Sequence, residues 1–108
     1  MNHKKLLAHA RSVYDECIAT MESKNKDYAH DGDAFANFRF AKMVHVDVDK
    51  AILVRMSDKL ARISNCIDKG EVAVKTESVR DTLMDLINYT AILAAYLSTN
   101  EGEISQGA

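Results

Sequence analysis

Hydrophobic residues recur at intervals of three and four along most of this chain, which is the spacing of one face of an α-helix. The pattern predicts long helices over residues 3–24, 47–69 and 76–98, and a short helix over residues 34–44. Gly70 directly follows the second long stripe, in the place where glycine commonly ends a helix. Helices therefore account for most of the chain.

Two segments lack this periodicity. Residues 24–33 are rich in Asn, Asp and Gly, which is typical of a turn, and Asp33 stands where it can cap the next helix. Residues 99–108 have no apolar stripe, and we expect them to form a disordered tail. Because no stretch alternates as a strand does, the sequence predicts an all-α fold, a compact bundle of four helices in a single domain over residues 1–98.

The last predicted helix has an acidic front opposite its apolar back. At about 100° per residue, four short polar side chains fall within a strip roughly 80° wide. They are Glu77, Asp81, Asp85 and Asn88. Like charges at this spacing repel one another, and a face selected only for solubility usually contains lysine as well. Short carboxylates on a covered helix face suit Mg²⁺, although an ordinary solvated face has the same spacing, so both interpretations stay open.

The helix predicted over residues 47–69 carries a charged strip made by Arg55, Asp58 and Arg62. These residues have the spacing of ordinary surface ion pairs along a helix. Two arginines beside an acid would equally suit a metal-bound polyphosphate, because guanidinium groups make bidentate contacts with phosphate oxygens.

All three phenylalanines of the protein, Phe35, Phe38 and Phe40, lie in the short helix together with Met43. We expect the three phenylalanines to anchor the core. An alternative is that Phe38 or Phe40 forms a wall on which a nucleotide base stacks.

Composition narrows the range of partners. The chain has 108 residues and a net charge of −2, so nothing attracts it globally to duplex nucleic acid or to an anionic membrane. Its N-terminus is amphipathic, unlike a signal peptide or a membrane span. Cys17 and Cys66 lack metal-ligand spacing, and we expect free, buried thiols and a cytoplasmic location. Residues 91–97 are apolar beyond one stripe, which favours a homo-oligomer.

Several blocks together resemble a known family. They are K-N-K-D-Y at 24–28, N-F at 37–38, R-M-S-D-K-L-A-R-I-S-N at 55–65 and E-S-V-R-D-T-L-M-D-L-I-N-Y at 77–89. In this order they resemble the phage-associated family often called nucleotide modification associated, which is similar to the all-α NTP pyrophosphatases of MazG and dimeric dUTPase type. A phage-encoded member would act in the cytoplasm of the host cell.

The resemblance implies a MazG-like helical bundle, usually oligomeric, that binds Mg²⁺ and acts on a nucleoside triphosphate. It implies catalytic and metal-binding roles for Asp58, Glu77, Asp81 and Asp85. The residues it implies for nucleotide binding are Lys24, Asn25, Asp27, Tyr28, Asn37, Phe38, Arg55, Lys59, Arg62, Asn88 and Tyr89.

The sequence departs from the pyrophosphatase pattern at two motifs. Thr82 stands three residues before Asp85, where those enzymes have a glutamate, and the E-x-x-E of the preceding helix is replaced by Asp58 with Lys59 and Arg62. Three hypotheses follow. The first is a magnesium-dependent enzyme that releases pyrophosphate, and the second is a module that sequesters a nucleotide or cyclic nucleotide without turnover. The third is a helical assembly protein whose acids only pair with the arginines of a neighbour.

Overall fold

The computed structural model describes residues 1–28, 32–70 and 77–102, and the side chains of residues 25–28 and 77–78 fall outside this description. In these parts of the chain there are helices and no strand, so the all-α prediction is confirmed. The helices are α1 (His3–Tyr28), α2 (Ala36–Arg39), η2 (Phe40–Val44), α3 (Val48–Asp68) and α4 (Glu77–Leu97).

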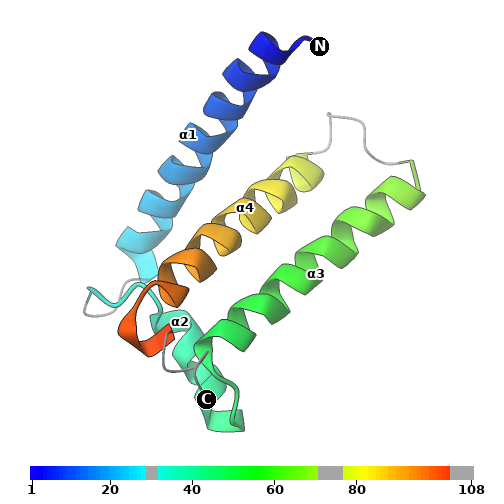
Figure 1. Ribbon diagram of the computed structural model, residues 1–108. Coiled ribbons are helices and arrows are strands. Elements are labelled where there is room, and N and C mark those ends of the chain that lie inside the picture. Colours follow the sequence, from blue (N-terminus) through cyan, green and yellow to red (C-terminus); the bar gives the residue numbers. More distant parts are fainter. Residues whose placement is uncertain (29–31, 71–76, 103–108) are drawn as a thin grey trace.

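Helix α4 lies between α1 and α3 (Figure 1). It packs closely along α3 and more sparsely against α1, while α2 and η2 pack beside the start of α3. The long helices thus form an open layer, and the predicted fourth member of a bundle is reduced to two short pieces. None of the described helices has the length and the low charge that crossing a membrane requires.

The most deeply buried cluster joins α3 to the end of α4. Val48, Ile52 and Tyr96 are almost fully buried. Phe35 meets the Tyr96 ring edge-on, with ring centroids 5.3 Å apart, and Phe38 meets Tyr89 in the same way at 6.1 Å. Edge-to-face pairs of this kind add to the stabilisation from apolar burial. The prediction that Phe35 and Phe38 anchor the core is therefore confirmed.

The same prediction is wrong for Phe40, which is 70% exposed. Phe40 follows Phe38 by two positions, about 160° around a helix, so the two side chains cannot face the same core. From Phe40 the helix changes from α to 3-10 geometry, with three residues per turn, and Met43 in this segment is 81% exposed.

The end of α1 and the start of α2 differ from their predicted positions, whereas the predicted end of α3 before Gly70 is confirmed. Helix α1 continues to Tyr28, so the turn predicted from residue 24 starts later. The polar sequence there shows that this part of the helix has no apolar side to bury, but it does not end the helix. The Asp33 carboxylate accepts a hydrogen bond from the Phe35 amide at 3.1 Å and holds the turn before α2, although Phe35 is itself the N-cap. Gly70 has a φ of 69°, as a glycine just after a helix requires.

Ordered structure continues past the predicted domain boundary at residue 98. The Thr99 hydroxyl donates to the Tyr96 carbonyl at 2.6 Å and accepts from the Gly102 amide at 3.1 Å. Gly102 is buried, and a Cβ there would overlap the Tyr96 carbonyl oxygen. Residues 99–102 therefore fold back on the end of α4, while the rest of the predicted disordered tail lies outside the described residues.

Arg39 links this C-terminal turn to the segment before α2. Its guanidinium donates to the Asp33 carboxylate from Nε at 2.5 Å and to Glu101 from Nη1 at 2.7 Å. These hydrogen bonds from Arg39 hold the pKa of both carboxyl groups below their ordinary values, and they raise the pKa of Arg39. One arginine thus ties together two segments that are far apart in the sequence.

We predict that Arg39→Gln lowers the free energy of unfolding at pH 7 by about 1 kcal/mol, the upper end for partly exposed ion pairs. The ordinary pKa values of Asp33 and Glu101 are 3.8 and 4.5, and the folded values lie below them. The ion pairs of Arg39 therefore stabilise the fold when the pH is above the ordinary pKa values of the two carboxyl groups. This stabilisation is lost as the pH falls through the lower pKa values that these groups have in the folded protein. Urea unfolding at pH 7 and pH 3 measures both free energies, with the exposed Arg11→Gln as control. An Arg39→Gln deficit of equal size at both pH values would contradict an ionic origin.

Candidate functional site

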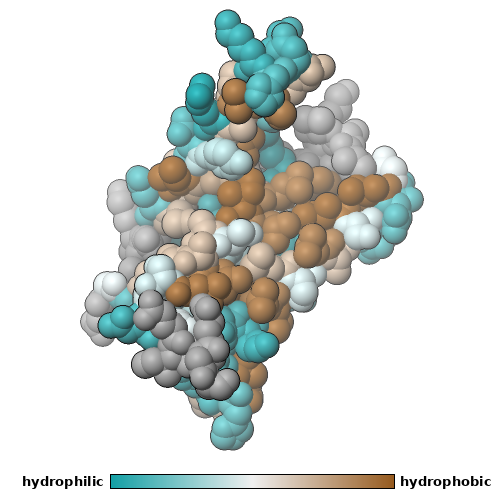
Figure 2. All heavy atoms as spheres, viewed as in Figure 1, coloured by the Kyte–Doolittle hydropathy of each residue, from teal (hydrophilic) through white to brown (hydrophobic). Residues whose placement is uncertain are grey.

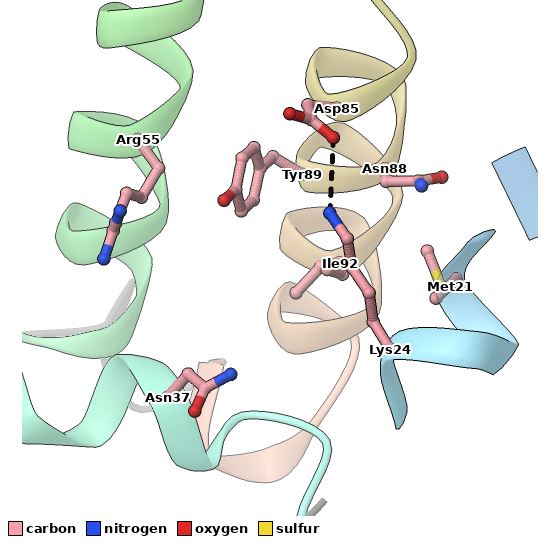
Figure 3. A pocket seen from close by; sticks show the side chains of 8 residues that line it. All are labelled: Met21, Lys24, Asn37, Arg55, Asp85, Asn88, Tyr89 and Ile92. Atoms are coloured by element: carbon pink, nitrogen blue, oxygen red, sulfur yellow. Dashed lines mark hydrogen bonds and ion pairs between the residues drawn. The ribbon is translucent and has the colours of Figure 1, made fainter. Parts of the chain in front are cut away.

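A cavity of about 440 Å³ opens between α1, α2, α3 and α4. Figure 3 shows side chains from all four helices turned toward this space. The lining residues are Met21, Lys24, Asn37, Arg55, Asp85, Asn88, Tyr89 and Ile92. Segments that are far apart in the sequence therefore meet at one site, and six of the eight side chains are among the residues predicted from the sequence.

Asp85 is the acidic side chain of the cavity lining, and two lysines pair with it. Its carboxylate accepts a hydrogen bond from the Lys24 ammonium at 3.4 Å and forms an ion pair with the Lys59 ammonium at 3.1 Å. The side chain of Lys59 is only 19% exposed and that of Asp85 is 25% exposed, so this contact is largely shielded from water. Lysines from α1 and α3 thus offset the repulsion expected within the acidic strip of α4.

Asn88 connects α4 to α1. Its amide nitrogen donates to the Cys17 carbonyl at 3.1 Å, and the Cys17 thiol makes a weak contact with the Met84 carbonyl at 3.9 Å. Both cysteines are free, as predicted, and burial raises the pKa of the Cys17 thiol. The part of the strip near Asn88 is therefore covered by α1, which the sequence suggested.

Arg55 and Tyr89 line the same cavity, and in Figure 3 the Arg55 side chain extends along α3 at the edge of this space while the Tyr89 ring of α4 faces α3. It is an exposed residue at the rim of the cavity, and no described carboxylate pairs with it. The surface ion pairs that were one interpretation of Arg55, Asp58 and Arg62 are likewise not found among the described side chains. A guanidinium at a cavity rim with no acidic neighbour to bind is available to an anionic ligand.

The other predicted site residues are distributed around this cavity. Asp81 lines a neighbouring depression of about 300 Å³ together with Lys24 and Asp85. Phe38 lines a hollow of about 410 Å³ on the far side of Arg55. Arg62 borders a different cavity of about 90 Å³.

Arg62 follows Arg55 by two helical turns, a distance of about 10 Å along the helix. Asp58 is exposed on α3 and lines none of these cavities. The side chains of Asn25, Asp27, Tyr28 and Glu77 lie outside the described residues.

The predicted four-acid magnesium site can be compared with this arrangement. Among the described residues, no three His, Cys, Asp or Glu side chains converge as metal ligands. Asp81 and Asp85 share one depression. Magnesium in nucleotide sites is commonly held by one or two carboxylates together with phosphate oxygens. These two acids therefore fit a magnesium ion that arrives with a phosphorylated ligand better than a resident ion.

Sequence reasoning did not identify Met21 as part of the site. It belongs to the apolar stripe of α1, and nothing in that stripe distinguishes a residue that faces a cavity from one that packs against α4. Ile92, an apolar residue that continues the polar strip of α4, was not among the predicted site residues either. Lys59 was predicted to contact phosphate, and in the structure it contacts Asp85.

Comparison with known proteins gives one match. A family model described as nucleotide modification associated domain 1 matches residues 24–96, which is more than half of the chain. This range contains every residue that lines the cavity except Met21. No curated protein and no solved structure matches the chain.

We predict that Asp85→Asn lowers the free energy of unfolding by about 1 kcal/mol, because it removes the acceptor of two partly shielded ion pairs. Asp81→Asn, at an exposed position of the same strip, should change it by less than about 0.5 kcal/mol. Chemical denaturation without added ligand measures both values. If Asp85→Asn were more stable than the parent, repulsion within the acidic strip would outweigh the two lysine contacts.

Proposed function

Because the chain belongs to the nucleotide modification associated domain 1 family, we propose that it binds a nucleotide in the cavity between α1, α2, α3 and α4. The observation that carries this proposal is the position of Arg55, which lines the cavity beside amide and aromatic side chains and has no described acidic partner. A volume of about 440 Å³ lies within the range of small-molecule sites.

The phosphate groups bind at the cationic side chains around the cavity. Arg55 offers a planar fork of donors, which suits two oxygens of one phosphate. Arg55, Lys24 and Lys59 carry three positive charges, against the two negative charges of Asp85 and of Asp81 in the neighbouring depression. Together these groups favour an anionic ligand over a neutral nucleoside.

The base and sugar bind against the apolar and amide side chains of the same cavity. Tyr89 and Ile92 supply apolar surface, and Asn37 and Asn88 supply amide donors and acceptors. Apolar walls with a few polar groups are the usual composition of a site that orients a small ligand. This arrangement supports recognition of a base by contact and hydrogen bonding.

Asp81 and Asp85 would hold a magnesium ion that accompanies the phosphates, and the ion would neutralise phosphate charge there. With Asp85 on the ion, Lys24 and Lys59 would be free to donate to phosphate oxygens. Without the ion, Asp85 pairs with these two lysines.

Binding is the function that this geometry supports best. Release of pyrophosphate, as in the MazG-type enzymes, needs carboxylates that converge on the metal and on the attacking water. Asp81 and Asp85 share a depression, Asp58 lines none of the cavities described above, and no three such side chains converge among the described residues. A module that holds a nucleotide without turnover requires no further acid.

We predict that Arg55→Lys lowers nucleotide affinity about tenfold, because lysine keeps the charge and loses the bidentate fork. The melting temperature without ligand should stay unchanged, since Arg55 has no described partner to lose. Calorimetry with magnesium and a panel of nucleoside mono- and triphosphates measures the affinity.

Arg11→Lys is the matched control, because Arg11 is exposed on α1 and lines none of the cavities described above. Equal affinity in the parent and in Arg55→Lys would remove Arg55 from the site. A parent that binds no nucleotide would leave only the assembly hypothesis. Phosphate analysis of the same mixtures detects turnover, and sustained pyrophosphate release would extend the proposal from binding to hydrolysis.

A further inference from the structure

A second hollow lies beside the nucleotide cavity, and the two spaces share part of their lining. Asn37 and Arg55 line both the cavity of about 440 Å³ and the hollow of about 410 Å³. Phe38 lines the hollow and Tyr89 lines the cavity, and their rings meet edge-on with centroids 6.1 Å apart. The two spaces are therefore neighbours, with an aromatic ring in the wall of each and one guanidinium at the border of both.

The hollow is apolar, and Arg55 is the only charged residue among the described residues that line it. Phe40 in its wall is 70% exposed and Val54 is 56% exposed, so both present apolar surface to the solvent. Phe40 is not part of the core, and a ring left open to solvent on a hollow is the kind of platform on which a nucleotide base stacks. Apolar walls with one cation at the edge suit a flat heterocycle attached to a phosphate.

Backbone contacts shape the hollow before any ligand binds. The Val46 amide donates a hydrogen bond to the Ala41 carbonyl at 3.0 Å, which closes the turn between η2 and α3. Both residues line the hollow. Ala41 and Ala51 have small side chains, which leave space open beside Phe40. The hollow is thus formed in advance, as small-molecule sites usually are.

Other surfaces around the cavity suit an extended phosphorylated ligand less well. The neighbouring depression contains Asp81 and Asp85, which repel phosphate unless a cation accompanies it. Helix α3 lies to the right of α4 in Figure 1 and to its left in Figure 3, so the cavity faces away from the viewer of Figure 1. Figure 2, seen from the same side as Figure 1, shows hydrophobic side chains gathered over α3 and α4 on the other side of the layer. A ligand longer than a mononucleotide therefore extends past Arg55 into the hollow.

We propose that the cavity and the hollow together bind a dinucleotide, a ligand in which phosphate bridges two nucleosides. This inference rests on the proposed function, because it places the first nucleoside in the cavity. Arg55 then holds the bridging phosphate from the border of the two spaces, and the second base stacks on Phe40. A phosphodiester carries a single negative charge, which one guanidinium can offset through two parallel hydrogen bonds.

Charge favours a free dinucleotide over a longer strand. The chain has a net charge of −2, and beyond Arg55 the described lining of the hollow adds no cation that could follow a phosphate backbone. Phosphodiester-linked dinucleotides and dinucleoside polyphosphates share the chemistry that the two spaces would recognise. The length of the phosphate bridge distinguishes these two sources by experiment.

We predict that a 5′-phosphorylated dinucleotide or a dinucleoside triphosphate binds about tenfold more tightly than the matching mononucleotide, because a second base stacks on Phe40. Phe40→Ala should abolish this gain and leave mononucleotide affinity unchanged, and Phe40→Tyr should retain the gain. Met43→Ala is the matched control, since Met43 is 81% exposed on η2 and lines none of the cavities. Calorimetry with magnesium and ligands that combine the four bases, in ribose and deoxyribose forms, measures the affinities.

Equal affinity for dinucleotides and mononucleotides would overturn the inference and leave the proposed function standing. So would an equal loss of both affinities in Phe40→Ala, because Phe40 would then belong to the mononucleotide site. A dinucleotide gain that survives Phe40→Ala would place the second base outside the hollow and would also refute the inference. Tighter binding of a single strand of about ten nucleotides would replace the dinucleotide by single-stranded nucleic acid. Failure of every nucleotide to bind would remove the inference together with the proposed function.

Discussion

The position of α4 between α1 and α3 is the constraint on which the rest of the structure depends. A helix at the centre of a layer has a neighbour on each side and two open faces, so its sequence must serve four directions at once. Thr82, Tyr89 and Tyr96 face α3, and Met84 and Asn88 meet α1. What remains is a polar strip on one open face and an apolar stripe on the other, and these two faces give the molecule its separate surfaces.

Polar contacts hold the helices at the cavity side of the layer. The Asp85 carboxylate brings Lys24 and Lys59 together from two different helices, and Asn88 binds the backbone of α1. Contacts of this type stabilise less per residue than apolar burial, but they leave charged and amide groups in place around a cavity. The arrangement suits the anionic ligand proposed above, because side-chain ion pairs can be exchanged without a change in the fold.

The C-terminal turn, residues 99–102, helps to hold the wall of the cavity that α2 forms. Asn37, which lines the cavity, sits in the short helix α2, and a helix of one turn has little stability of its own. Phe35 and Phe38 anchor this segment on the aromatic rings of α4, and Arg39 ties it to Asp33 and Glu101. The wall of the cavity formed by α2 is therefore held in place by residues at the very end of the described chain.

Periodicity alone determined that the chain is all-α, where the three long helices run and that Gly70 ends α3, because these features follow from contacts within a few residues. It also identified the polar strip of α4, and the ordered blocks of the resemblance identified most of the cavity residues. Only the tertiary structure decided that Asp85 is held by two lysines, that Asp58 and Arg62 lie apart from the cavity, and that Phe40 and Met43 are exposed. Those outcomes depend on how helices from distant parts of the chain pack beside one another. The spacing of residues along one helix shows which of its sides is apolar, but it does not show which helix packs against that side.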